Sequence, residues 1–411
     1  MIAFQAGQVL TPFIQVTPGV ILIEAGKIVA VGTPLEVSIP SGSKIFSAGD
    51  KIVVPGFVDT HTHGGEGIYY GEAVDSTNRL CQNIVRTGVT SLLPTLAGLL
   101  PIHYTLEMYL DRIRVIRQAM LQNKGGAEIL GIHMEGPYLS RATKVIGSQV
   151  ADNLRQPSMH ELLQMVEASE CSLRKMTIAP ELEDALDIIA ALAEMNIVPS
   201  AGHSEATYEQ TQQAIHAGLS CATHIFNGML TFHHRKPGLI GAILTCDEIN
   251  AELIADGQHV SYPTIDILLR CKGVDGVHLV TDHTTWAGLP VGEYSDGSRT
   301  VVKEDLRAYV AGGTLIGGVA PMNACVHNMI SEMDCSLAEA VQMASANPAR
   351  VIGVDDRKGV LMPGKDADLL VIDEQVRVYL AMVRGQVVYK DGGCIENTRE
   401  PTKNEKNFHE L

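Results

Sequence analysis

The chain has 411 residues, 45% of them hydrophobic and 19% charged, which is typical of a globular protein with a large core. A formal net charge of −16 argues against binding to nucleic acid or to an anionic membrane surface. No apolar run is long enough to span a bilayer, and eight dispersed cysteines favour a reduced, cytoplasmic protein.

Both ends of the chain contain short strand-like runs separated by tight turns. Gly19–Ile23 and Ile28–Val31 flank a predicted hairpin turn. A similar pattern of short strand-like runs and turns recurs in residues 367–389. Two β-rich ends around a different middle predict one small domain assembled from both termini. The expected regions are a small β-sandwich domain from 1–54 and 359–396, a central domain over 55–358 and a polar tail over 397–411.

The central region alternates short apolar runs with helical segments. The predicted strands end at Asp59, Pro94, Met134, Ala179, Ala201, Thr223, Ala255 and Thr281. Ser204 is the predicted N-cap of a helix over 205–217, and Ser336 with Glu339 forms a predicted capping box. This alternation predicts an α/β fold, a (β/α)8 TIM barrel. A doubly wound open sheet is the alternative, disfavoured because no glycine-rich phosphate motif follows the first strand.

Side chains that can bind metal ions follow five of these predicted strands. They are His61 and His63 after the first strand, Glu135 after the third, His203 after the fifth, His224 after the sixth and Asp282 after the eighth. The carboxyl ends of barrel strands meet at one mouth, and histidines two apart on a strand point to the same face. Mixed imidazole and carboxylate ligands predict a divalent metal, zinc or alternatively iron, rather than magnesium or calcium.

Each histidine taken alone is more often a hydrogen-bonded core residue than a ligand, so the prediction depends on their convergence. His133 is ambiguous and can instead orient a ligand. A bound zinc ion lowers the pKa of water to about 7 and polarises a carbonyl. Amide hydrolysis also needs a group that returns a proton to the leaving nitrogen, a role that suits Asp282. The alternative for Asp282 is a helix N-cap before Thr284.

Further motifs extend over almost the whole chain. They include Pro55-Gly56-Phe57-Val58-Asp59 before His61-x-His63, His133-x-Glu135-Gly136-Pro137, Ala201-Gly202-His203-Ser204, Ala222-Thr223-His224-x-Phe226-Asn227, Arg235-x-Pro237-Gly238, Ala255-Asp256-Gly257-x-His259, Val280-Thr281-Asp282 and Pro363-Gly364-Lys365-x-Ala367-Asp368. Together they resemble the amidohydrolase superfamily, and specifically N-acetylglucosamine-6-phosphate deacetylases. The resemblance implies that Glu135, His203 and His224 hold the main metal ion. Glu135 then bridges to a second ion on His61 and His63, giving one or two ions per subunit.

The resemblance also implies a site for a sugar phosphate. Asn227, Gly228 and His259 correspond to phosphate-binding positions of the family, as does Arg235, which reaches in from a partner subunit and so implies a homodimer. Residues 233–236 are the densest cationic stretch of an acidic chain, which fits capture of a phosphate dianion. No lysine stands where dihydroorotase-like relatives carry a carbamylated one, which disfavours those relatives.

Several positions that resemble sugar-facing sites depart from the family pattern. Gln149 replaces the histidine of a usual Lys-Gly-Ala-His, and Trp286 stands in a region that prefers small residues. We therefore expect both to contact substrate. The leading expectation is deacetylation of N-acetylglucosamine 6-phosphate. The alternatives are another N-acyl sugar, such as N-acetylgalactosamine 6-phosphate, a non-sugar amide, or a non-catalytic scaffold that has kept the barrel.

Overall fold

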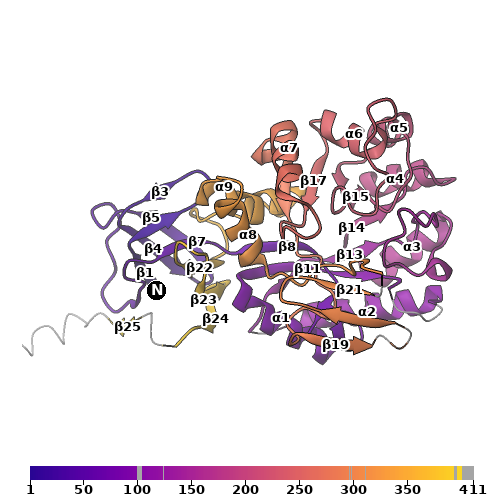
Figure 1. The fold of residues 1–411 in the computed structure, drawn as a ribbon. Helices are drawn as coiled ribbons and strands as arrows, with labels where there is room; N and C mark the ends of the chain where they lie inside the picture. Colours follow the sequence, from indigo (N-terminus) through magenta and orange to yellow (C-terminus); the bar gives the residue numbers. More distant parts are fainter. Residues whose placement is uncertain are drawn as a thin grey trace, which may run out of the picture.

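The computed structural model describes residues 1–99, 104–123, 125–295, 297, 299–310, 312–392 and 396–399. Its centre is a parallel sheet (Figure 1) whose strands are almost entirely buried. All nine residues of β11 (Val89–Ala97) are buried, as expected for a strand covered on both faces. The other strands around the barrel are β8 (Phe57–Thr62), β13 (Ile132–Glu135), β14 (Leu173–Ile178), β15 (Val198–Ala201), β16 (Cys221–Ala222), β17 (Asn250–Leu253) and β18 (Val277–Leu279).

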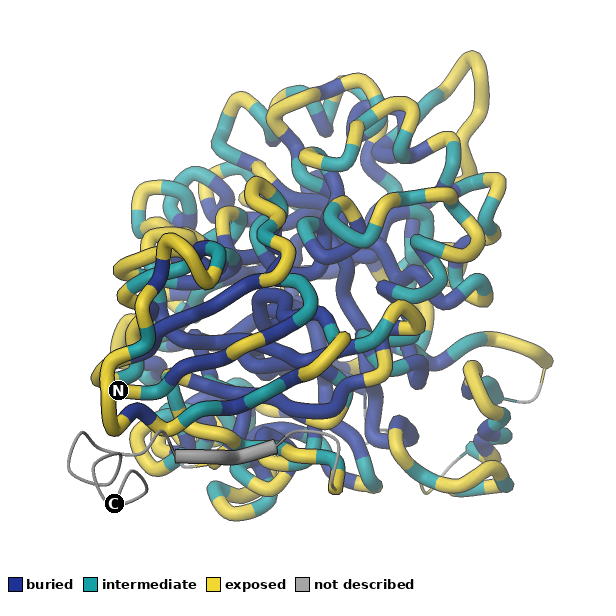
Figure 2. The backbone as a smooth tube through the Cα atoms, turned by 90° about the vertical axis from the view of Figure 1, so that its left-hand side faces the viewer, coloured by how far each residue is buried: buried dark blue, intermediate teal, exposed yellow. Residues whose placement is uncertain are grey.

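Helices alternate with these strands and cover the outside of the barrel (Figure 1). In chain order they are α1 (Val74–Ile84), α2 (Leu106–Gln122), α3 (Met159–Ala168), α4 (Ala185–Glu194), α5 (Tyr208–His216), α6 (Gly238–Thr245), α7 (Tyr262–Lys272) and α8 (Met322–Ser331), followed by α9 (Leu337–Ala344) and α10 (Ala346–Val351). Figure 2 shows the result as buried central strands within a more exposed outer layer. The strand-and-helix alternation that the sequence predicts is thus present.

The seam between the first and last strands closes through side chains and strand extensions. Asp59 on β8 accepts a hydrogen bond at 2.5 Å from the hydroxyl of Thr281, which lies just beyond the end of β18. The backbone N–H of Asp282 donates to the carbonyl of His61 at 2.9 Å, and Thr62 forms a parallel bridge with His283. These contacts place the residues after β8 beside those after β18, at the mouth.

The two ends of the chain form two further sheets beside the barrel. One comprises β25 (Glu396–Arg399), β6 (Lys44–Ser47), β1 (Ile2–Ala6), β4 (Gly19–Glu24) and β5 (Lys27–Gly32). The other comprises β24 (Gln386–Lys390), β23 (Val378–Val383), β22 (Leu369–Ile372), β7 (Ile52–Pro55), β2 (Gln8–Leu10) and β3 (Gln15–Val16). Phe4, Ile21 and Leu380 belong to one buried cluster that joins both sheets. The predicted fold class, a barrel with a small β-domain from both termini, is confirmed.

Local predictions succeed where hydrogen bonding within a few residues decides the structure. The Ser336–Glu339 capping box before α9 is confirmed. Ser204 is not a helix cap: its hydroxyl donates to Glu181 at 2.7 Å, and Thr207 caps α5 through a capping box with Gln210. The reason is that the chain after His203 first turns over the barrel rim, so the helix begins three residues later than predicted.

Some features of the fold were not predicted. A three-stranded antiparallel sheet, β19 (Gly292–Ser295), β20 (Thr300–Lys303) and β21 (Ala308–Val310), follows β18. The first residues assigned to the polar tail, 397–399, belong to β25, and the rest of that tail lies outside the described residues. Short elements complete the list: β9 (Gly64–Gly65), β10 (Ile68–Tyr69), β12 (Glu128–Ile129), η1 (Val85–Thr87), η2 (Ala151–Asn153) and η3 (Val274–Gly276).

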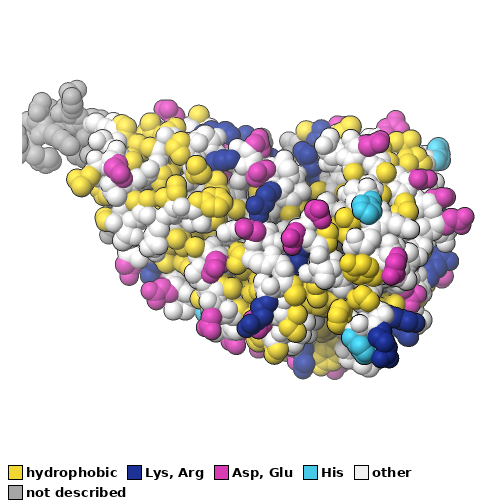
Figure 3. Space-filling view, turned by 90° about the horizontal axis from the view of Figure 1, so that it is seen from above, with side chains coloured by type: hydrophobic (Ala, Val, Ile, Leu, Met, Phe, Trp, Pro, Cys, Tyr) yellow, Lys and Arg dark blue, Asp and Glu magenta, His cyan; other side chains and the backbone are white. Residues whose placement is uncertain are grey.

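The surface mixes the two signs of charge. On the face in Figure 3, acidic and basic side chains are interspersed among apolar and neutral groups. None of the helices in the described part of the chain is long and apolar enough to cross a membrane.

Candidate active site and metal centre

Strand ends bring all six predicted metal-centre residues to one point at the barrel mouth. His61 and His63 come from the end of β8, and Glu135 is the last residue of β13. His203, His224 and Asp282 each follow a strand by two or three residues: β15, β16 and β18 respectively. Their ligand atoms form two buried triads that share one carboxylate, namely His61, His63 and Glu135, and Glu135, His203 and His224.

Every imidazole of these triads is oriented by a hydrogen bond at Nδ1. Nδ1 of His63 faces the Thr95 carbonyl at 3.3 Å, that of His203 the Val145 carbonyl at 2.8 Å, and that of His224 the Asn227 carbonyl at 3.2 Å. His61 uses a carboxylate instead, Glu252, at 3.0 Å. An acceptor at Nδ1 places the proton there and leaves the Nε2 lone pair free, which is the form that binds a metal ion. All four histidines therefore have the orientation of metal ligands.

The Nε2 atoms also have the spacing of ligands around common ions. Nε2 of His61 and His63 lie 3.2 Å apart, as do those of His203 and His224. Glu135 Oε1 lies 3.1 Å and 2.9 Å from Nε2 of His203 and His224. Donors bound tetrahedrally to zinc at its usual bond lengths are about 3.3 Å apart. The residues therefore fit one divalent ion in each triad, with Glu135 shared between the two.

Neighbouring histidines keep the two carboxylates of the centre ionised despite their burial. Burial alone raises the pKa of Glu135, but the neighbouring imidazoles of His203 and His224 bring it well below its usual range. Burial likewise raises the pKa of Asp282, whereas His61 and His63 lower it to about 2. Asp282 Oδ1 lies 3.1 Å from Nε2 of His63 and 3.4 Å from that of His61. At neutral pH Asp282 is thus a carboxylate that can accept a proton beside the first triad.

Three of these residues have left-handed backbone conformations that side chains seldom adopt. The φ angles are +46° at His203, +30° at His224 and +48° at Asp282. Such conformations cost about 1–3 kcal/mol each and persist where surrounding structure enforces them, commonly at active sites. Here the turn directs each side chain back over the barrel mouth instead of outward along the strand.

A cavity of about 130 Å³ opens directly on the centre. Four of the residues predicted to bind substrate line it: Gln149, Asn227, Gly228 and His259. Nε2 of Gln149 donates to Glu135 at 2.7 Å, while its buried Oε1 has no hydrogen-bond partner among the described residues. Nδ1 of His259 pairs with Asp256 at 2.7 Å, and its buried Nε2 is likewise without a partner in the described part of the chain. These free polar atoms are suited to a polar ligand.

The other two predicted substrate contacts lie elsewhere. Arg235 is exposed on the loop before α6, where its guanidinium contacts His234 at 3.0 Å. Trp286 packs into a buried apolar cluster with Val301 and Ile316, beneath the β19–β21 sheet. Neither side chain lines the cavity. Gly228 does line it, and a Cβ there would lie 2.7 Å from Nδ1 of His203.

Ambiguous and unpredicted residues lie beneath the centre. Nδ1 of His133 contacts the Thr95 hydroxyl at 3.1 Å and its Nε2 the Thr177 hydroxyl at 2.9 Å, so both ring nitrogens are engaged away from the triads. Glu252, which holds His61, was not predicted. Its only signal in the sequence is a carboxylate within the apolar run 251–255, and that pattern does not say which side chain it faces.

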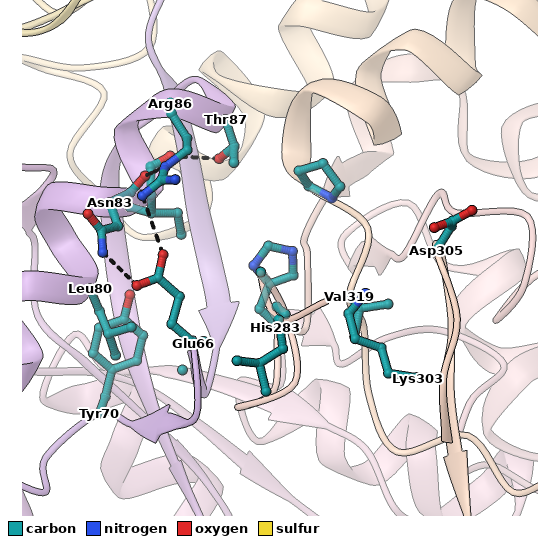
Figure 4. Close-up of a pocket in the computed structure, with 17 residues that line it drawn as sticks. Glu66, Tyr70, Leu80, Asn83, Arg86, Thr87, His283, Lys303, Asp305 and Val319 are labelled. Atoms are coloured by element: carbon teal, nitrogen blue, oxygen red, sulfur yellow. Dashed lines mark hydrogen bonds and ion pairs between the residues drawn. The ribbon is translucent and has the colours of Figure 1, made fainter. Parts of the chain in front are cut away.

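A neighbouring cavity of about 330 Å³ lies against the same loops but contains none of the ligand residues. Figure 4 shows Glu66 in this cavity, where it accepts hydrogen bonds from Asn83 at 2.7 Å and from Arg86 at 3.3 Å. It lies across from the ring of His283. That ring is held by the Ala320 carbonyl at 2.8 Å. The larger volume therefore does not mark the reactive site, since the groups able to bind metal and move protons surround the smaller cavity.

A parallel barrel with paired histidine–carboxylate triads at its carboxyl end defines a class of protein, the metal-dependent barrel hydrolases. Comparison with known families matches residues 52–388 to the amidohydrolase family. An N-acetylglucosamine-6-phosphate deacetylase of Lysinibacillus sphaericus is 34% identical over 82% of this chain and 85% of its own. An N-acetylgalactosamine-6-phosphate deacetylase of Escherichia coli O157:H7 is 35% identical over 88% and 93% respectively.

The solved structures agree. A mutant N-acetyl-D-glucosamine-6-phosphate deacetylase from Mycobacterium smegmatis, in complex with N-acetyl-D-glucosamine-6-phosphate, superposes with a TM-score of 0.86. It is 31% identical, and the match covers 95% of this chain and 99% of that one. The chain belongs to the amidohydrolase family, in the branch of deacetylases that act on N-acetylated amino-sugar phosphates.

Proposed function

We propose that this enzyme hydrolyses the N-acetyl group of N-acetylglucosamine 6-phosphate, releasing acetate and the amino-sugar phosphate. The observation that carries the proposal is the set of four oriented imidazoles, Glu135 and Asp282 gathered at the barrel mouth, all but His61 lining one cavity. His61, His63, Glu135, His203 and His224 would hold one or two divalent ions, zinc first and iron as the alternative. A bound ion supplies an acidified water and polarises the amide carbonyl.

The proton steps belong to Asp282. Its ionised carboxylate accepts a proton from the attacking water and returns it to the amide nitrogen, so that the C–N bond breaks with loss of a neutral amine. Gln149 orients the substrate: its side-chain carbonyl, fixed by the bond from Nε2 to Glu135, accepts the amide N–H. A neutral acceptor fits an amide N–H better than it fits a phosphate.

Phosphate binding is assigned to His259, to the Asn227–Gly228 backbone and to Arg235 of a second subunit in a homodimer. The support comes from position: His259, Asn227 and Gly228 line the cavity, whereas Arg235 projects outward from its own subunit. We expect Trp286 to act indirectly, by supporting the loop that carries Asp282 and Thr284. We also expect the enzyme to work in the cytoplasm.

A second candidate substrate is N-acetylgalactosamine 6-phosphate. The specific observations that favour it are the 35% identity to a deacetylase of that name and the presence of Gln149 where the resemblance expects histidine. Turnover of both N-acetylhexosamines, each with and without a 6-phosphate, separates the candidates. We expect the highest kcat/KM for N-acetylglucosamine 6-phosphate. Turnover of the unphosphorylated sugars alone would contradict the phosphate assignment of Arg235 and His259.

A further inference from the structure

Glu252 is a fully buried carboxylate in β17 that contacts both metal triads. Its Oε2 accepts hydrogen bonds from Nδ1 of His61 at 3.0 Å and from the backbone N–H of His224 at 3.0 Å. His61 belongs to the first triad and His224 to the second. One oxygen atom therefore links the two halves of the centre.

The acceptor of His61 differs in kind from those of the other ligands. Of the four histidines in the two triads, His63, His203 and His224 donate from Nδ1 to neutral backbone carbonyls, and His61 donates to a carboxylate. A charged acceptor forms a stronger hydrogen bond, fixes the tautomer and makes the opposite ring nitrogen a better ligand. The bond to the His224 backbone also stabilises the left-handed turn that directs this side chain into the centre.

Lys175 on β14 supplies the opposite charge. Its ammonium pairs with Oε1 of Glu252, and neither side chain has exposed surface. β15 and β16 separate β14 from β17 in the sheet, so the ion pair crosses the barrel interior. A buried carboxylate without such a partner is strongly disfavoured in its charged form. Cys221 and His278 also approach Glu252, but the Lys175 ammonium provides the positive charge there.

We propose that Glu252, paired with Lys175, is a positioning residue that orients His61 and His224 so that both metal sites can be filled at once. This inference rests on the metal-dependent activity proposed above, but it concerns ion binding and is tested separately from turnover. It assigns no contact with substrate to either residue.

The test is zinc affinity, measured by competition with a chelator, together with zinc stoichiometry and thermal unfolding. Glu252→Gln keeps the shape but removes the charge. We expect zinc to bind about 10–100-fold more weakly at one or both sites. The double variant Glu252→Gln, Lys175→Met removes both buried charges and should recover thermal stability without recovering zinc affinity. Glu128→Gln is the matched control, because Glu128 also pairs with a buried lysine, Lys358, but lies away from the centre.

If the double variant bound zinc with wild-type affinity and stoichiometry, the proposal would be overturned, and the role of Glu252 would be purely structural. A loss of zinc affinity in Cys221→Ser equal to that in Glu252→Gln would also overturn the proposal, because it would place Glu252 with Cys221 in a separate metal site. The proposed function fails differently: the wild-type protein would bind two zinc ions yet release no acetate from the phosphorylated sugars.

Discussion

At the scale of single residues, the site combines fixed groups with free polar atoms. Gln149 shows both, because its amide nitrogen holds Glu135 while its carbonyl oxygen is buried without a partner among the residues described. If that oxygen accepts the substrate N–H, Gln149→Ala should lower kcat/KM about ten-fold, equivalent to about 1.4 kcal/mol, the worth of one good hydrogen bond. Steady-state kinetics with metal analysis checks this. A loss of activity that follows a loss of metal would contradict the substrate contact.

His259 gives the site a dependence on pH. Burial alone lowers its pKa, but the Asp256 carboxylate, 2.7 Å from Nδ1, raises the pKa above 6.5. If the protonated ring donates from Nε2 to the substrate phosphate, KM for a phosphorylated substrate should rise as pH rises through this pKa. Asp256→Asn should move that rise to lower pH, and KM for an unphosphorylated sugar should not change. A KM for the phosphorylated sugar that is constant with pH would exclude this role.

At the scale of elements, the barrel seam depends on a buried carboxylate. Asp59 accepts bonds from the Thr281 hydroxyl at 2.5 Å and from the backbone N–H groups of Thr281 and His61. Thr281→Val removes the shortest of these and should lower the free energy of unfolding by about 1–3 kcal/mol, since it leaves the buried Asp59 carboxyl group, whose pKa burial raises to about 7, without its closest partner. Thr90→Val is the control, because the Thr90 hydroxyl makes only a 3.4 Å bond to a neutral carbonyl. Urea unfolding compares the two variants. Equal losses of unfolding free energy would argue against a special role for the Asp59–Thr281 contact in closing the barrel.

The barrel strands could be predicted because each lies in or beside a short apolar run that alternates with helical segments. The clustering of the candidate ligands could be predicted because they lie at the ends of those strands or directly after them. The β19–β21 sheet was missed, since its strands are partly exposed and lack the continuous burial of the barrel strands. Glu252 was missed for another reason: the sequence does not reveal that β17 and β14 face each other across the barrel.

At the scale of the whole molecule, the position of Arg235 bears on assembly. Its side chain is exposed and lies outside the cavity of its own subunit. If it serves the neighbouring subunit, Arg235→Ala and Asp282→Asn should each be inactive alone, yet co-expression should restore activity. Half of randomly mixed dimers pair the two variants and carry one intact site, so about one quarter of wild-type activity is expected. No recovery in verified mixed dimers would show that Arg235 does not act across the interface.

In the proposed reaction, a buried metal centre and the Asp282 carboxylate together hydrolyse an N-acetyl amide. The most direct measurement is acetate release from N-acetylglucosamine 6-phosphate by wild type and Asp282→Asn, with metal content determined on the same samples. We predict bound zinc in both proteins and a fall in kcat of at least about 100-fold in the variant, the usual contribution of a positioned acid–base group. Unchanged hydrolysis by a metal-loaded Asp282→Asn enzyme would show that Asp282 does not transfer the proton.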